Sequence, residues 1–276
     1  MKVSLHWLKR FVDFDLTATD LADKLTMRGF ESEVVTDFDS LDNLVVGNVL
    51  TAEKHPDADK LKLCSVSDGN ETFNVVCGAP NIDAGQKIVF AKVGAVLPGD
   101  FKIGKAKIRG VESFGMICSE RELGISEEHD GIMVLDDSVK AGTPIKDILG
   151  PLFNAIDIEV TPDKAFALSH RGIAREVATI VGSKLKAPIS TVKLNSKSKD
   201  VVSVDLDKKG GCTRYIAGVM KNVKVGPSPD WLADYLKSVG QKSINNLVDI
   251  SNFMLVEIGH PTHIFDLNKL DKSAIK

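Results

Sequence analysis

The chain has 276 residues, of which 43% are hydrophobic, so it can bury substantial cores in one to three domains. Acidic residues outnumber basic residues by 38 to 35, and total charge therefore gives no reason to expect a nucleic-acid partner. Any case for such a partner must rest on local basic clusters. The sequence has neither a signal-peptide core nor an apolar span of 18 residues, so we expect a cytoplasmic protein with no membrane partner.

The cysteines are too far apart to suggest a metal cage. There are four, they form no CxxC pair, and no histidine lies close to them: Cys64, Cys77, Cys118 and Cys212. We expect reduced, mostly buried thiols and no metal site.

The first 40 residues are predicted to be largely helical. Thr17 and Asp20 give a helix start that resembles a capping box, Leu21 and Leu25 form an apolar stripe, and Gly29 supplies a stop. A second predicted helix has Ser169 as its N-cap and Gly182 as its stop, with an apolar face of Ile173, Val177, Ile180 and Val181.

Between these helical regions, short β-rich runs are separated by glycine, proline and aspartate. The runs cover residues 45–49, 61–66, 73–76 and 87–93. Several short strands at such spacing predict a small closed barrel, for which the five-stranded oligonucleotide-binding (OB) fold is one solution. We therefore predict an α+β, multidomain chain. An OB-fold domain at residues 40–151 is inserted into a small discontinuous helical α/β domain made of residues 1–39 plus 152–195.

The last third begins after a polar stretch, residues 193–200, which is typical of a linker. Strands are expected at 201–206 and 215–219. Ser228 is expected to cap a helix with Pro229 at its first position. The buried side of that helix is predicted to hold Trp231, Leu232, Tyr235, Leu236 and Val239.

One segment, residues 101–110, holds four basic residues and no acid. In a strand, Lys105, Lys107 and Arg109 would project from one face, while Ala106 and Ile108 would turn inward. A basic strand face suits a phosphate backbone. On charge alone, a solvated strand face is the simpler interpretation.

Residues 244–258 predict a helix with an unusual polar stripe. Asn245, Asp249 and Asn252 recur at spacings of four and three, next to His260 and His263. Such a stripe suits either a polar ligand or a satisfied network that fixes the following turn. The residues alone leave both possibilities open.

Four segments in order resemble the tRNA-binding barrel shared by synthetase appendages and stand-alone tRNA-binding cofactors: His55–Leu61, Val76–Asn81, Gly94–Gly99 and Ile108–Gly124. The resemblance implies a tRNA-facing surface, with Gly110 and Gly115 at tight turns. Together with the basic segment, the candidates are Lys60, Lys62, Lys105, Lys107, Arg109, Ser113, Met116 and Ser119.

Further segments extend a resemblance over nearly the whole chain: Val160–Glu176, Cys212–Tyr215, Val225–Leu232, Ile244–Asn252 and Glu257–Asp266. They are similar to the β subunit of bacterial phenylalanyl-tRNA synthetase. This resemblance implies that residues 200–276 are the first part of an α+β editing module of the B3/B4 type. Candidates carried over by position are Asn246, Ser251, Asn252, Glu257 and His263. The chain departs from the family pattern at Asp163, Lys164, Ser251, His260 and Ile264.

The resemblance implies a role within a larger enzyme. The family attaches phenylalanine to tRNA(Phe) using ATP and magnesium, as an α2β2 heterotetramer with an α subunit. Its β subunit is much longer than this chain, so we expect an N-terminal part that binds tRNA and contributes to hydrolysis of mischarged tyrosyl-tRNA(Phe). No residue for aminoacylation and no bound cofactor are expected here. The alternatives are a stand-alone tRNA-binding adaptor and an assembly scaffold without catalysis.

Overall fold

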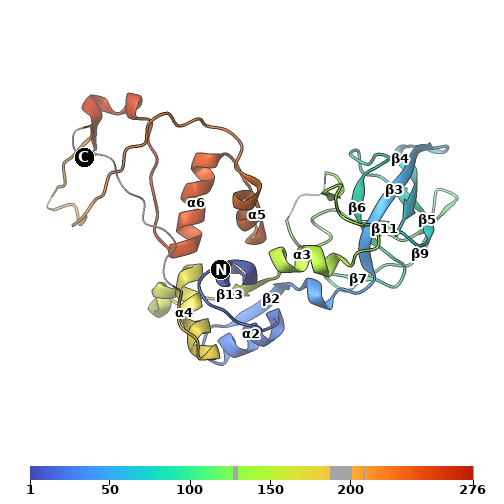
Figure 1. The fold of residues 1–276 in the computed structure, drawn as a ribbon, viewed down its shortest axis with the longest axis horizontal. Coiled ribbons are helices and arrows are strands. Elements are labelled where there is room, and N and C mark those ends of the chain that lie inside the picture. Colours follow the sequence, from blue (N-terminus) through green and yellow to red (C-terminus); the bar gives the residue numbers. More distant parts are fainter. Residues whose placement is uncertain (127–129, 187–200, 208, 276) are drawn as a thin grey trace.

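The computed structural model describes residues 1–126, 130–186, 201–207 and 209–275. Figure 1 shows a small unit around the N-terminus, a β-rich lobe to one side of it, and two helices, α5 and α6, above it. Helix α3 (Ile145–Phe153) lies between the lobe and the small unit. None of the described helices is both long and apolar enough to cross a membrane.

The N-terminal unit is built on an antiparallel sheet with the strand order β1-β13-β2. Strands β1 (Lys2–Ser4) and β2 (Ser32–Thr36) both pair with β13 (Ala155–Ile158), so the start of the chain shares one sheet with residues beyond 154. The helices of the unit are α1 (Leu5–Leu8), α2 (Ala18–Thr26) and α4 (His170–Val181), with short 3-10 turns at η1 (Phe38–Ser40) and η2 (Pro162–Ala167).

The helix boundaries follow the local sequence. The Thr17 hydroxyl accepts from the Asp20 N–H at the start of α2, and the Ser169 hydroxyl accepts from the Gly172 N–H at the start of α4. Gly29 and Gly182 have positive φ angles of 79° and 66° just beyond the helices. These predictions are confirmed. The expectation of a largely helical start was incomplete, because β1 and β2 lie in the same 40 residues.

The β-rich lobe contains a sheet with the order β11-β6-β3-β4-β5, and β12 also pairs with β6. The predicted β-rich runs are confirmed as strands, although three of them are longer than expected and the run at 87–93 ends two residues early, at Ala91. Within the described residues, no pairing of the first strand with the last closes this sheet. Its strands are β3 (Leu44–His55), β4 (Ala58–Ser67), β5 (Thr72–Cys77), β6 (Lys87–Ala91), β11 (Met116–Ile117) and β12 (Val134–Leu135).

Two small hairpins flank this sheet. One joins β7 (Val96–Leu97) to β8 (Phe101–Lys102), and the other joins β9 (Lys105–Ile108) to β10 (Val111–Phe114), which packs against β5. The basic segment was expected to form one strand. It forms two short strands and a turn instead. Arg109 lies in that turn with a φ of 47°, off the strand face, and Ala106 is exposed instead of turned inward.

The C-terminal part contains α5 (Asp230–Ser238) and α6 (Asn246–Ile258), followed by η4 (Leu267–Lys269) and η5 (Asp271–Ser273). Strands β14 (Ser203–Val204) and β15 (Ala274–Ile275) pair in parallel. The expected strand at 201–206 is reduced to β14, and the strand expected at 215–219 is absent. The predicted linker at 193–200 lies outside the described residues.

The start of α5 also differs from expectation. Pro229 is the N-cap, while the Ser228 hydroxyl donates to Asp249 Oδ2 at 2.5 Å. A hydrogen bond from the Ser228 hydroxyl to a buried carboxylate is stronger than the bond to a neutral group that a helix cap would offer. Trp231 was expected on the buried side but is 54% exposed, whereas Leu232 and Leu236 are buried.

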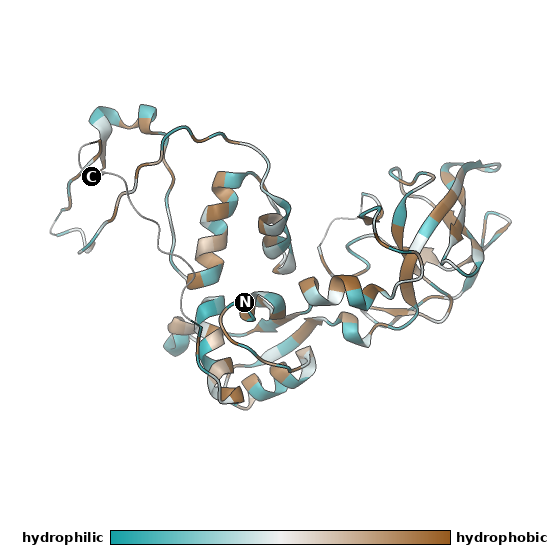
Figure 2. Ribbon diagram, in the orientation of Figure 1, coloured by the Kyte–Doolittle hydropathy of each residue, from teal (hydrophilic) through white to brown (hydrophobic). Residues whose placement is uncertain are grey.

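Helices α5 and α6 pack on the N-terminal unit through an aromatic cluster. The Trp7 ring stacks on His170 at a centroid distance of 4.3 Å and on Phe253 of α6 at 4.7 Å. Leu232 and Leu236 of α5 belong to the same hydrophobic core. Figure 2 shows hydrophobic residues along α6 and along the strands of the lobe, which holds two further clusters of its own.

Candidate nucleic-acid interface

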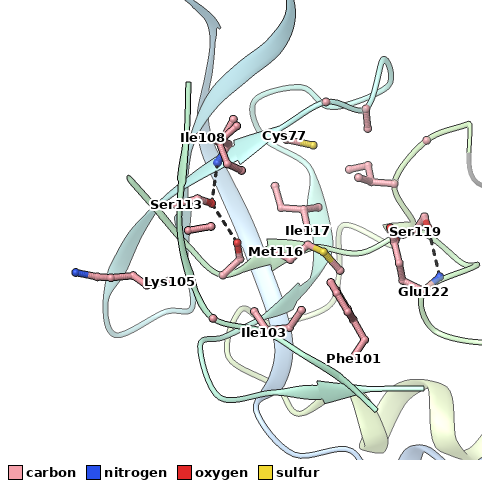
Figure 3. Close-up of a pocket in the computed structure, with 18 of the residues that line it drawn as sticks. Cys77, Phe101, Ile103, Lys105, Ile108, Ser113, Met116, Ile117, Ser119 and Glu122 are labelled. Carbon is pink, nitrogen blue, oxygen red and sulfur yellow. Dashed lines mark hydrogen bonds between the residues drawn. The ribbon is translucent and has the colours of Figure 1, made fainter. Parts of the chain in front are cut away.

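A cavity with a volume of about 680 Å³ lies in the β-rich lobe. It is bounded by the segment from Phe101 to Ala106, by the turn after β5, and by the turn from Ser119 to Glu122 (Figure 3). Its floor is apolar and includes Met116, Ile117 and Ile132.

Four of the eight candidates for tRNA contact line this cavity: Lys105, Ser113, Met116 and Ser119. The other four do not. Lys60, Lys107 and Arg109 are exposed elsewhere on the lobe, and the Lys62 ammonium donates to the Ile82 carbonyl at 2.6 Å. The structure therefore brings half of the candidates to one site and leaves the rest spread over neighbouring surface.

Both serine hydroxyls at the cavity are already bonded within the protein. Ser113 Oγ accepts from the Val76 N–H at 3.1 Å and donates to the Gly115 carbonyl at 3.2 Å, which ties β10 to β5. Ser119 Oγ donates to Glu122 Oε2. With 2% and 6% of their surfaces exposed, these serines hold the walls of the cavity in place.

Sequence reasoning did not single out Phe101 and Lys102, which also line the cavity. The Phe101 ring is 55% exposed and borders a second cavity of about 430 Å³ as well. An exposed aromatic beside basic residues is a common platform for single-stranded nucleic acid. The signal was present in the sequence as a phenylalanine directly before the run of lysines.

Among the described residues, no acid forms an ion pair with Lys102 or Lys105 at this face. Lys105 Nζ lies 4.3 Å from the centroid of the Phe114 ring, a cation–π contact that holds the side chain over β10.

Burial raises the pKa of the Cys77 thiol at the cavity wall and, nearby, raises that of Cys64 to about 11. Both are protonated and unreactive at neutral pH, as expected for structural thiols.

None of the editing candidates lines either of the two cavities in the lobe. Ser251 Oγ bonds to the Thr262 carbonyl and hydroxyl, each at 2.9 Å, which fixes the segment carrying His263 beside α6. His263 is exposed, and its ring centroid lies 6.4 Å from that of Phe265. The Asn252 side chain has no hydrogen-bond partner in the part of the chain that the structure describes.

Asn246 and Glu257 are bonded to segments other than the one that follows α6. The Asn246 amide donates to the Lys224 carbonyl at 2.9 Å and accepts from the Gly226 N–H at 3.3 Å. Glu257 is only 9% exposed and accepts a hydrogen bond from Arg10. These two side chains therefore hold neighbouring segments to α6.

The polar stripe on α6 had two interpretations, a site for a polar ligand or a satisfied hydrogen-bond network. In the structure it is largely a satisfied network. Asn245 caps the helix by accepting from the N–H groups of Leu247 and Val248. Asp249 is fully buried and accepts from the Ser228 and Ser243 hydroxyls and the Ile244 N–H. Burial acts to raise the pKa of this carboxyl, but those hydrogen bonds outweigh it and lower the pKa. Among the described residues, no group of three or more His, Cys, Asp or Glu side chains is placed to hold a metal ion.

Comparison with known proteins gives long matches to one group. The chain is 46% identical to "Phenylalanine--tRNA ligase beta subunit" of Syntrophotalea carbinolica over all of this chain and 34% of the relative. Corresponding proteins of Desulfotalea psychrophila and Geobacter sulfurreducens are 47% and 46% identical over all of this chain and 34% and 35% of their lengths. The chain belongs to the phenylalanine–tRNA ligase β-subunit family. It spans about a third of the length of these relatives.

Two domain families also match within this β-subunit sequence. The family described as "Putative tRNA binding domain" covers residues 44–144, and the "B3/4 domain" family covers residues 211–276. The cavity lies in the first match, and α5 and α6 lie in the second. Among solved structures, the "MetRS related protein from Pyrococcus horikoshii" matches 36% of this chain and 85% of that chain at 29% identity, with a TM-score of 0.28.

Proposed function

We propose that this chain binds tRNA through the cavity face of its β-rich lobe, as part of an enzyme that attaches phenylalanine to tRNA(Phe). The observation that carries the proposal is that Phe101, Lys102 and Lys105 meet at one cavity inside the match to the tRNA-binding family. The exposed ring offers a surface for base stacking, and the ammonium groups suit phosphates.

We also propose the domain boundaries expected from the sequence. The lobe, residues 40–151, is an OB-type barrel inserted into a domain made of residues 1–39 plus 152–195, and residues 200–276 begin an editing module. The common sheet of β1, β13 and β2 supports the insertion. The bond from Val76 to Ser113 supports a barrel, because it links β5, at one edge of the sheet, to the separate β9–β10 hairpin.

A second role is proposed for α6 and the loop after it, which would form one wall of a site that hydrolyses tyrosyl-tRNA(Phe). An apolar pocket rejects a substrate with one added hydroxyl only about 100-fold, so a second, hydrolytic site is useful. Ester hydrolysis needs an oriented water and a stabilised oxyanion. The Asn252 amide has no hydrogen-bond partner among the described residues, and His263 is exposed and fixed beside α6 by the Ser251 contact, so both are suited to these tasks. Asn246 and Glu257 would act by holding the wall.

The names of the relatives support a proposal for the wider assembly. We propose a partner α subunit in an α2β2 complex in the cytoplasm, with ATP and magnesium used by the complete enzyme and not by this region. The match to relatives over all of this chain favours this function over a stand-alone tRNA-binding adaptor or a scaffold without catalysis.

The test is tRNA binding measured by fluorescence anisotropy over a range of salt concentrations. Phe101→Ala removes the stacking surface and is expected to weaken binding by about 1–3 kcal/mol. Phe166→Ala is the matched control, because Phe166 is 52% exposed in η2, outside the lobe. Equal affinity of the wild type and Phe101→Ala would rule out the cavity face as the binding surface.

A further inference from the structure

The large cavity has a different charge at each of two walls. Among the described residues that line it, the cations Lys102 and Lys105 come from the segment after β7, and the one carboxylate, Glu122, comes from the turn after β11. Figure 3 shows Lys105 and Glu122 on opposite sides, with Phe101 on the Glu122 side. A phosphate is attracted to the first wall and repelled by the second. The second wall instead requires a ligand group that donates a hydrogen bond.

The Glu122 carboxylate is fixed before any ligand binds. The Ser119 N–H donates to Glu122 Oε2 at 2.5 Å, and the Ser119 hydroxyl donates to the same oxygen. The Glu122 N–H in turn donates to Ser119 Oγ at 3.4 Å. Glu122 Oε1 has no partner within the described part of the chain. A preset acceptor of this kind binds an N–H donor without reorganisation of the site.

The space beside this acceptor suits a single nucleotide. Its volume of about 680 Å³ falls within the usual range of small-ligand pockets, about 300–1,000 Å³. Phe101 and Glu122 also share the neighbouring cavity, so the stacking surface and the acceptor border the same region. A base stacked on Phe101 would present its edge, not its phosphate, toward the carboxylate.

The chemistry of the acceptor selects among the bases. Guanine carries two adjacent donors on its Watson–Crick edge, N1–H and the N2 amine. Adenine and cytosine place an acceptor nitrogen beside their amine, and uracil places a carbonyl on each side of its N3–H. A carboxylate oxygen is therefore attracted most strongly to guanine and least strongly to uracil.

We propose that this cavity is a nucleotide subsite that prefers an unpaired guanine, with the base stacked on Phe101, its N1–H and N2 amine bound by Glu122, and its phosphates near Lys102 and Lys105. Glu122 is thus a specificity-determining residue for the RNA. This inference rests on the proposed function, since the guanine arrives as part of an RNA strand.

The test uses the full chain and short, labelled oligouridines in which one central nucleotide is guanosine, inosine, adenosine, cytidine or uridine. Anisotropy titrations at fixed salt are expected to show the guanosine strand bound on the order of tenfold more tightly than the uridine strand. Inosine keeps the N1–H but lacks the N2 amine, so its strand is expected to bind with intermediate affinity. This comparison needs no variant and remains decisive if a substitution disturbs folding.

Glu122→Gln is expected to lower the affinity for the guanosine strand to that for the uridine strand, which removes the preference. The matched control is Glu112→Gln, the same change at an exposed residue of β10 outside the cavity lining, which is expected to keep the preference. Equal affinity for all five strands, with binding still present and salt-dependent, would overturn the subsite and leave the proposed function standing. Absence of binding to any strand and to tRNA would overturn both.

Discussion

Arg10 and Glu257 lie 247 residues apart in the chain, yet Arg10 Nε donates to Glu257 Oε1 at 3.0 Å. The Arg10 guanidinium also lies over the rings of Tyr235 and Phe253, at 5.4 and 5.6 Å from their centroids. One side chain after α1 thus contacts both α5 and α6. This contact fixes the C-terminal helices on the N-terminal unit.

Arg10→Ala is expected to destabilise the chain by about 1–3 kcal/mol, because it leaves the poorly exposed Glu257 carboxylate without its charged partner. The measurement is the urea midpoint of unfolding. Lys54→Ala is the control, since it breaks a pair with Asp59 in which both side chains are exposed. It is expected to change stability by less than about 1 kcal/mol. Equal effects of the two changes would mean that the Arg10 contact does not hold the helices.

His170 is expected to make stability fall in mild acid. Burial lowers its pKa from 6.5 to about 3, and its ring nitrogens bond to the Ser4 N–H and the Val256 carbonyl. Because the folded pKa lies below the unfolded pKa, the unfolded state binds the proton first as pH drops. The stabilisation is complete above pH 6.5 and is lost toward pH 3, at up to about 1.4 kcal/mol per pH unit.

Urea unfolding at several pH values between 6.5 and 5 checks this prediction, since most carboxylates are still ionised in that range. His170→Gln is expected to be less stable at pH 7 but to show a shallower pH dependence. His260→Gln, a change at an exposed histidine, is the control and should keep the wild-type slope. A wild-type slope in His170→Gln would assign the acid sensitivity to other groups.

The basic hairpin is expected to contribute phosphate contacts to tRNA binding. Replacing Lys105, Lys107 and Arg109 together by alanine should weaken binding and reduce the slope of log affinity against log salt. Each lost contact lowers that slope by about 0.7–0.9. A triple change of the exposed residues Lys24, Lys140 and Lys146 removes the same charge elsewhere on the surface. If the hairpin variant kept the wild-type affinity and slope, its lysines would be only a solvated face.

Gly115 and Gly110 are expected to differ sharply in their tolerance of alanine. Both have positive φ angles, 124° and 89°. A Cβ at Gly115 would lie 2.6 Å from the Ala91 carbonyl oxygen, whereas a Cβ at Gly110 would meet nothing within 4 Å. Gly110→Ala should cost about 1–2 kcal/mol of backbone strain, and Gly115→Ala should cost more because backbone must move as well. Thermal or urea unfolding of both variants gives the comparison, and equal losses would contradict it.

His263 is expected to matter for editing and not for charging. In the proposed α2β2 enzyme, His263→Ala should slow the proposed deacylation of tyrosyl-tRNA(Phe) while the rate of phenylalanine attachment is unchanged. The isolated chain is expected to do neither reaction, because the proposed wall leaves His263 exposed and catalysis requires placement within about half an ångström. Both rates are measured with labelled amino acid. Robust deacylation by the isolated chain, abolished by His263→Ala, would show that the site is complete here.

The sequence by itself determined several local elements and the family. Thr17, Ser169, Gly29 and Gly182 mark helix ends correctly because capping depends on a few neighbouring residues and their φ angles. The β-rich runs and the ordered motifs were likewise readable, and the family resemblance is confirmed by relatives that match the whole chain.

Only the tertiary structure decided which side chains meet. The Ser228 hydroxyl bonds to the Asp249 carboxylate of α6 instead of capping α5, and Arg10 bonds to Glu257, which is distant in the sequence. At the cavity, Phe101 comes together with Glu122 although different elements carry them. Periodicity and capping rules report on residues within about one or two turns of one another. Contacts between distant segments depend instead on how whole elements pack, and that information lies in no local pattern.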